Sequence, residues 1–214
     1  MFPSLELPTK GASQRHLPSL STIPFLPMQL IYKGKTKQSL PKVQFPKGFS
    51  LSANPSHYSN EKESIKFISE IILPHLQKER TKIAREDQKA LLIFDVFRGQ
   101  TTDKVLNLLK DNNILVTKVP ANMTHIFQPL DLTVNKAAKD FTRDKFSDWF
   151  TKQINLGLDK GLELNDIVVD YKLSVLKPLH AKWLISFYDY MSTVKGKDVI
   201  ANGWKKSGIF DAIQ

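Results

Sequence analysis

Residues 90–119 read ALLIFDVFRGQTTDKVLNLLKDNNILVTKV, and the order of apolar runs in this stretch indicates the fold class. Ala90 to Phe94 is a continuous apolar run that ends at Asp95, as in a strand buried on both faces within a parallel region of a sheet. A helical pattern follows, and a second apolar run from Ile114 to Val119 comes after it. The stretch therefore predicts a strand-helix-strand unit.

The sequence before this unit predicts one strand and one long helix. A short apolar run from Met28 to Tyr32 reads as a strand, and the Pro- and Ser-rich residues 36–59 read as an irregular connection. Asn60, with Glu63 three residues later, has the spacing of a capping box. We expect an amphipathic helix to begin there and to bend or restart near Pro74.

The sequence after the unit predicts a loop and two long helices. Residues 121–131 read as the loop, and the first helix carries apolar residues on one side and mostly cations on the other. Pro178 suits the first turn of the last major helix, because the missing proline N–H has no partner there in any case. The chain then closes with Asn202-Gly203-Trp204 and a short hydrophobic end.

Composition bounds the class of protein. The chain has 214 residues, of which 41% are hydrophobic and 24% charged, which is typical of one globular domain. Residues 1–28 contain five prolines and six Ser or Thr residues, which predicts an irregular arm at residues 1–25. The domain is expected to span residues 26–210. There is no cysteine and no run of apolar residues long enough to span a membrane, so we expect neither disulfides nor insertion.

The charge of the chain favours a polyanionic partner. The net charge is +10, and residues 1–60 carry seven Lys or Arg residues against one acid, Glu6. Lysine and arginine gain binding free energy when they release counterions from nucleic-acid phosphates. Nucleic acid is therefore the expected partner, with a merely solubilising role of the charge as the alternative.

Two acids follow the predicted strands. Asp95 ends the first strand of the unit, and Asp131 opens the helix after the second. The carboxyl ends of strands in an open α/β sheet border one crevice, so the two carboxylates are candidates to converge on Mg²⁺, which prefers carboxylate oxygens. An Asp at either position is also common as a turn former or helix cap, and spacing alone does not separate these readings.

Motifs on both sides of these acids resemble one family. The segments LLIFDVFRGQTTDKVLNLLKDNNI and VPANMTHIFQPLDLTVNKAAKDF resemble the region around the second and third acids of DDE superfamily endonucleases of the pogo/Tigger and jerky type, which include centromere protein B. LPMQLIYKGKTKQSLPK, NPSHYSN and NGWKKSGI extend the resemblance from about Leu26 to Ile209. The fold that it implies is α/β and ribonuclease H-like, a mixed sheet flanked by helices, with no intact first strand and with a C-terminal helical part.

The resemblance also implies a site. Asp95 corresponds to the second catalytic acid and Asp131 to the third, and in such a family the acids bind Mg²⁺ or Mn²⁺ for DNA cleavage and joining. Several further residues match the family around these acids and are expected to shape the site or to position water or phosphate: Gln100, Asn122, Thr124, Gln128 and Pro129. A purely structural role is the alternative for both glutamines.

Two groups of cations are candidates for phosphate contacts. Lys33, Lys35 and Lys37 alternate, so an extended backbone would put all three on one face. The second group lies on the helix after Asp131 and comprises Lys136, Lys139 and Arg143. Solvated surface is the alternative for both groups.

The chain departs from the family pattern in its first acid. The family carries that acid on a strand upstream of the LPMQLIYKGKT match, where this chain has only Glu6. We therefore expect a nuclear, transposase-derived domain that binds DNA with little or no strand transfer. The alternatives are an active magnesium-dependent endonuclease, with Glu6 as a replacement or with a truncated gene model, and a protein-interaction module. The sequence leaves the oligomeric state open.

Overall fold

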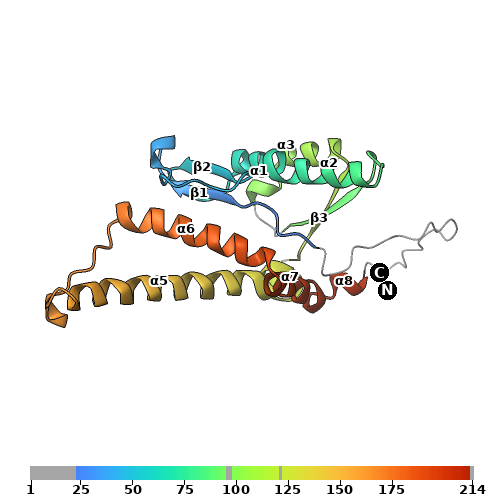
Figure 1. Ribbon diagram of the computed structural model, residues 1–214. Coiled ribbons are helices and arrows are strands. Elements are labelled where there is room, and N and C mark those ends of the chain that lie inside the picture. The colour runs from blue at the N-terminus through green and yellow to red at the C-terminus, as the bar shows by residue number, and fades with distance from the viewer. Residues whose placement is uncertain (1–22, 95–97, 121, 213–214) are drawn as a thin grey trace.

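The computed structural model describes residues 23–94, 98–120 and 122–212, so most of the expected arm and Asp95 lie outside the described residues. Figure 1 shows two layers: the strands with α1, α2 and α3 form one, and the helices from α5 onward form the other. The strands are β1 (Gln29–Lys33), β2 (Ser50–Asn54), β3 (Ala90–Phe94) and β4 (Ile114–Lys118). The α-helices are α1 (Glu61–Phe67), α2 (Leu73–Lys82), α3 (Asp103–Asp111), α4 (Thr124–Phe127), α5 (Asn135–Leu158), α6 (Leu173–Ser192), α7 (Val194–Lys206) and α8 (Ile209–Ala212). Two π segments, η3 (Ile68–Ile72) and η5 (Leu130–Val134), and three 3-10 turns, η2 (Lys37–Ser39), η4 (Arg98–Gln100) and η6 (Leu164–Asp166), complete the elements.

The strand-helix-strand unit is confirmed. β3 and β4 pair in parallel with Phe94 opposite Lys118, and α3 connects them. The expectation of one mixed sheet is wrong for the described residues, where β1 and β2 form one parallel pair and β3 and β4 another. Within the described part of the chain, no strand of one pair hydrogen-bonds to a strand of the other, and no fifth strand lies between them.

The strand β2 was not expected, because residues 36–59 read as a connection. Its sequence SLSAN alternates polar and apolar residues but contains none of the β-branched or aromatic residues typical of strands, yet it pairs with β1 along its whole length. Ser50 is 1% exposed, and its hydroxyl donates to Glu70 at 2.6 Å. A polar strand is stable here because its hydroxyl groups find carboxylate partners on the helix above it.

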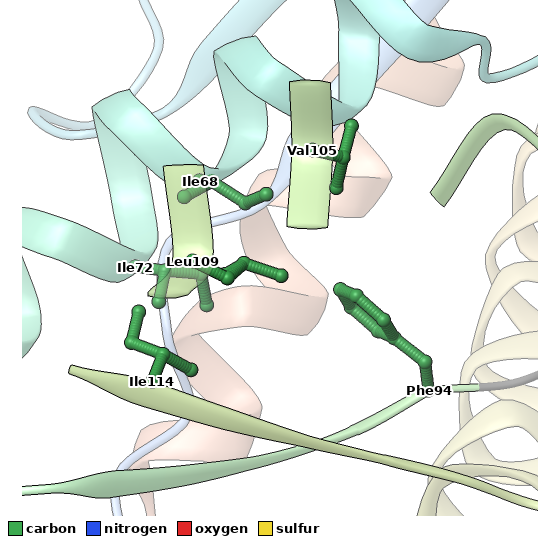
Figure 2. Packing of buried hydrophobic residues seen from close by; sticks show 6 residues of the cluster. All are labelled: Ile68, Ile72, Phe94, Val105, Leu109 and Ile114. Carbon is green, nitrogen blue, oxygen red and sulfur yellow. The ribbon is translucent and has the colours of Figure 1, made fainter. Parts of the chain in front are cut away.

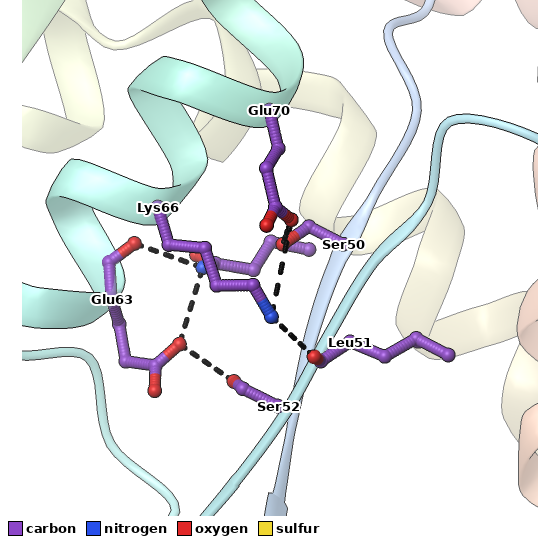
Figure 3. Close-up of polar contacts among 7 residues, drawn as sticks. Ser50, Leu51, Ser52, Glu63, Lys66 and Glu70 are labelled. Carbon is purple, nitrogen blue, oxygen red and sulfur yellow. Dashed lines mark hydrogen bonds and ion pairs between the residues drawn. The ribbon is translucent and has the colours of Figure 1, made fainter.

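Further polar contacts join β1 and β2 to α1 and η3 (Figure 3). Glu63, which is 4% exposed, accepts hydrogen bonds from Ser52 Oγ at 2.6 Å and from Gln29 Nε2 at 3.4 Å. Lys66 donates to the carbonyl oxygen of Leu51 and lies 3.9 Å from Glu70. The network satisfies the polar groups that the packing of helix on strands buries.

The long helix begins as expected and is interrupted before Pro74. Asn60 is the N-cap, and its side chain accepts from Glu63 N at 3.0 Å. In η3 the hydrogen bonds span five residues, so that Leu73 N donates to Ile68 O. Proline has no N–H to continue the α-helical pattern, and the π segment lets the helix pass it.

The first hydrophobic core lies between this helix, α3 and the β3-β4 pair. Figure 2 shows its six buried residues, which converge from all of these elements: Ile68, Ile72, Phe94, Val105, Leu109 and Ile114. Val105 and Leu109 are fully buried, and each buried side chain of this size contributes roughly 1.5–3 kcal/mol. This core holds the last residue of β3 in place.

The C-terminal part is helical, as the resemblance implied. α5 and α6 run antiparallel side by side (Figure 1), and a second core joins them to α7 through Val134, Phe187, Met191 and Ile200. Phe25, from the segment before β1, packs edge-on against Phe187 at 6.0 Å between ring centroids.

Two expectations about helix positions in this part are wrong. Pro178 lies inside α6, which begins at Leu173, because the five residues before the proline already form the first turns. A further helix, α7, follows α6 where only a short end was expected, and Thr193 caps it by accepting from Gly196 N at 3.3 Å. Among the helices of the described residues, none is long and apolar enough to cross a membrane.

Candidate active site

The expected site begins at the carboxyl end of β3. Phe94 is the last residue of the strand and is 7% exposed, and its carbonyl oxygen accepts from Val119 N at 2.8 Å. β4 ends beside it at Lys118, so both strands terminate at the same edge. Asp95 is the next residue in the chain and lies outside the described residues.

The loop that leads from β4 to Asp131 has a defined backbone. Asn122 has φ +62°, a left-handed conformation that asparagine adopts more readily than most residues. Met123 N donates to Pro120 O at 3.1 Å, and the loop then forms the short helix α4, which starts at Thr124. The turn and α4 together connect β4 to η5.

Gln128 and Pro129 directly precede η5, and Pro129 is its N-cap. The carbonyl oxygen of Gln128 accepts from Asp131 N at 3.1 Å and from Leu132 N at 3.2 Å. Pro129 is already helical, with φ −53°, and its ring fixes that angle where the helix begins. The backbone of Asp131 is thereby held within a helical turn.

The Asp131 carboxylate is on the surface. The residue is exposed, and its Oδ1 accepts a hydrogen bond from Nδ2 of Asn135, one turn later. This contact orients the carboxylate without burying it. Asn135 was not expected in the site, and its i, i+4 spacing from Asp131 is the signal in the sequence that points to it.

Two predicted site residues have buried side-chain oxygens without partners. Gln100 Oε1, in the turn after β3, and Gln128 Oε1, before Asp131, accept no hydrogen bond from any described residue. Buried polar atoms usually have a partner, and each of these two oxygens lacks one among the described residues. Amide and carboxylate oxygens are the donors that Mg²⁺ prefers, and in chemical type the residues fit such an ion. The described residues contain no cluster of three or more acids or histidines that could hold a metal.

The first turns of α5 carry three of the predicted cations. Lys136, Lys139 and Arg143 are all exposed, and their spacing puts them within one face of the helix. Arg143 also pairs with Asp140 at 3.0 Å, an exposed contact between side chains one turn apart. These cations follow Asp131 directly along the chain.

The other predicted group of cations does not share a strand face. Lys33 is the last residue of β1, and the ladder ends just after it, where Gly34 N donates to Asn54 O at 3.0 Å. The backbone then bends, and Lys37 starts the 3-10 turn η2. All three lysines, Lys35 included, are exposed, but the extended conformation assumed for Lys33 to Lys37 is wrong.

The helix α7 packs against η5, the turn that carries Asp131. Thr133 Oγ1 donates to the carbonyl oxygen of Val199 at 2.8 Å. Gly203 lies so close to this turn that a Cβ atom on it would be 2.5 Å from the carbonyl oxygen of Pro129. Sequence reasoning missed this support, and the glycine in Asn202-Gly203-Trp204 was its only signal.

A groove of about 760 Å³ lies between α5, α6 and β1. Tyr32 lines it, and burial raises the pKa of its hydroxyl to about 12. Lys177 lies 5.8 Å from the centre of the Tyr32 ring and donates to Ser39 O at 2.9 Å. His180 is on the rim, where burial by the neighbouring walls lowers its pKa although the side chain remains partly exposed.

A parallel strand-helix-strand unit followed by an acid at the start of a long helix is compatible with a DDE-type domain. The chain belongs to the DDE superfamily endonucleases, whose family model matches residues 20–214. It resembles two human proteins, being 25% identical over 144 residues to "Pogo transposable element with ZNF domain" and 28% identical over 124 residues to "Pogo transposable element with KRAB domain". These matches identify it as a transposase-derived domain of the pogo type.

The two alignments cover 67% and 58% of this chain but only 10% and 19% of the two human proteins, so the chain spans a small part of the length of these relatives. No solved structure matches the chain.

Proposed function

We propose that this DDE domain binds DNA along the first turns of α5 and that the 214-residue chain by itself performs little or no strand transfer. The observation that supports binding is the exposed row of Lys136, Lys139 and Arg143 directly after Asp131. Cations in such a row release counterions when they contact successive phosphates. The overall charge of +10 acts in the same direction, and a DNA partner implies a nuclear location.

The expectation of weak catalysis rests on the acids. Asp95 and Asp131 would hold a divalent cation, with the side-chain oxygens of Gln100 and Gln128, which are near the two acids in the sequence, as further candidate ligands. When bound, such a cation would activate water or a DNA 3′ hydroxyl for attack on a phosphate. Two carboxylates neutralise less of the metal charge than three, and Glu6 is the only acid of this chain upstream of β1.

The residues of this chain would then act mainly in binding and positioning. Asn135 orients the Asp131 carboxylate through its hydrogen bond to Oδ1. The contacts of α7 with η5 fix the turn that carries this carboxylate. The cations of α5 would hold the phosphate backbone beside it.

Salt dependence of DNA binding tests the binding part. We expect the logarithm of the association constant of duplex DNA to fall steeply with the logarithm of salt concentration, by about 0.9 for each phosphate contact. The triple variant Lys136→Ala, Lys139→Ala, Arg143→Ala removes these contacts and flattens the slope. A matched triple variant at the exposed Lys152, Lys160 and Lys172 loses the same charge and retains the slope. A flat slope for the unmodified chain contradicts DNA binding and favours a protein-interaction module.

Plasmid nicking tests the catalytic part. The purified chain is incubated with supercoiled plasmid in Mg²⁺ or Mn²⁺ beside Asp95→Asn and Asp131→Asn variants, and metal binding is followed at the two aspartates by NMR. We expect no more nicking from the unmodified chain than from the variants. Nicking that either substitution abolishes would show a working site, and a parallel Glu6→Gln variant would then tell whether Glu6 contributes.

A further inference from the structure

The connection between α5 and α6 displays an unusual number of apolar side chains. This segment, residues 158–171, is called the tip here, and it forms the free end of the helix pair in Figure 1. Its exposed large apolar residues are Leu158, Leu162, Leu164, Val168 and Tyr171. Val168 is 92% exposed, although valine is among the residues most often buried. Apolar side chains gathered on one exposed segment mark a contact surface.

The tip is a built turn. Leu162 N donates to Gly157 O at 3.2 Å, and Gly161 has φ +80°, as expected where a helix ends. Ile167 packs so tightly on Gly157 that a Cβ atom there would be 2.7 Å from its side chain. The backbone is therefore fixed in a shape that holds the apolar side chains outward.

The tip is also acidic, in a chain of net charge +10. It contains four acids against a single cation, Lys160: Asp159, Glu163, Asp166 and Asp170. An acidic, apolar surface is poorly suited to nucleic acid. It requires a partner surface that is apolar with cations around it.

The groove between α5, α6 and β1 has the complementary character. Its walls include Leu176, Phe146 and Trp183, and its cations are Lys139, Arg143 and Lys177. Among the described residues that line it there is no acid. Its volume of about 760 Å³ can accept several apolar side chains.

We propose that the chain forms a two-fold dimer in which the tip of each copy docks in the groove of the other. Both features belong to the same pair of helices, so one two-fold axis forms both contacts at once. Leu158 of the tip and Thr142 of the groove are 16 residues apart on α5, about 24 Å along the helix axis. Two copies of the helix pair lying antiparallel with an overlap of this length bring each tip to the other groove.

Self-association is measured by sedimentation equilibrium in the absence of DNA. We expect a species of twice the 24.4 kDa chain mass, with a dissociation constant that rises on the order of tenfold when salt is increased from 0.1 to 1 M. The tip variant Leu164→Lys, Val168→Lys removes apolar contacts and opposes the groove charge, and it weakens the dimer on the order of a hundredfold. The control Ile83→Lys, Val194→Lys adds the same charge at exposed apolar residues elsewhere and leaves the dimer intact.

A groove variant gives the second arm. Thr142→Glu, His180→Glu puts two acids into the groove, whose lining also includes Lys139 and Arg143. Because sedimentation is measured without DNA, the result reports on the dimer alone. We expect this variant to be monomeric. Its urea unfolding midpoint should equal that of the unmodified chain when both are measured at concentrations below the dissociation constant of the dimer.

Mixing the two variants distinguishes this arrangement from others. The tip variant retains a groove and the groove variant retains a tip, so an equimolar mixture forms a heterodimer through one intact contact although each variant alone is monomeric. A dimer formed by tip against tip would give no heterodimer in the mixture. The absence of a heterodimer therefore overturns the proposal. A monomer at all concentrations of the unmodified chain overturns it as well.

Discussion

Thr133 donates a hydrogen bond of 2.8 Å to the carbonyl oxygen of Val199, 66 residues later in the chain. This contact fixes the turn of η5 that carries Asp131 to α7, a helix that the sequence did not indicate. Gly203 completes the support, because its missing side chain allows α7 to approach the carbonyl oxygen of Pro129. The position of the expected third acid thus depends on the last long helix of the chain.

Replacing the hydroxyl of Thr133 tests this support. Thr133→Val preserves the shape of the side chain but removes the donor to Val199, so we expect a loss of about 1 kcal/mol in the free energy of unfolding. Urea denaturation measures it. Thr151→Val, at an exposed position on α5, is the control and changes stability by less than about 0.5 kcal/mol. Equal effects of the two substitutions would show that the Thr133 contact contributes nothing.

The close approach at Gly203 gives a second prediction. An alanine Cβ there would be 2.5 Å from Pro129 O and 2.6 Å from Thr133 Oγ1, so Gly203→Ala forces α7 away from η5 and costs on the order of 1–3 kcal/mol. Chemical shifts of the Asp131 amide would change as well. Asn202→Ala, one residue earlier and exposed, leaves both the stability and the shifts unchanged. An unchanged Asp131 signal in Gly203→Ala would contradict the supporting role of α7.

Phe94 anchors the end of β3, immediately before Asp95. Phe94→Ala leaves a cavity among Ile68, Ile72 and Leu109 and is expected to lower the free energy of unfolding by about 3–5 kcal/mol. Leu91→Ala on the same strand, where the side chain is 54% exposed, is expected to cost less than about 1 kcal/mol. Similar losses in the two variants would mean that the first core does not hold the strand end.

His75 predicts how stability depends on pH. Burial lowers its pKa in the folded protein, and nearby Lys82 and Lys78 act in the same direction against Glu79. The unfolded chain, whose histidine has a pKa near 6.5, therefore binds a proton first as pH falls, and the folded state loses stability below about pH 6.5.

The check is urea denaturation at pH 7.5 and pH 5.5. His75→Gln cannot take up the proton, so we expect its stability to fall less between the two pH values than that of the unmodified chain. His57→Asn, at an exposed histidine whose left-handed backbone asparagine tolerates, serves as the control and follows the unmodified chain. A larger pH dependence in His75→Gln would show that the sign of the shift is wrong.

Local patterns in the sequence predicted several elements correctly. The apolar run of β3 fits its strand residue for residue, and the capping role of Asn60 is confirmed by its hydrogen bond to Glu63 N. Both signals involve residues close together in the chain, where apolar period and side-chain capping act directly on the backbone. Pro178 was misplaced because proline tolerates the first turn of a helix without requiring it.

The sequence by itself determined the strand-helix-strand unit, the basic charge and the order of motifs that identify the family. Only the tertiary structure decided the rest of the site: β2 is a strand because Glu63 and Glu70 accept from its serines, and Asp131 is held by α7 through Thr133 and Gly203. The physical reason is that such hydrogen bonds and close approaches join residues that are between 11 and 74 positions apart, from Ser52 and Glu63 to Pro129 and Gly203. Their partners become visible only when the chain has packed, because no local period or spacing records which surfaces will meet.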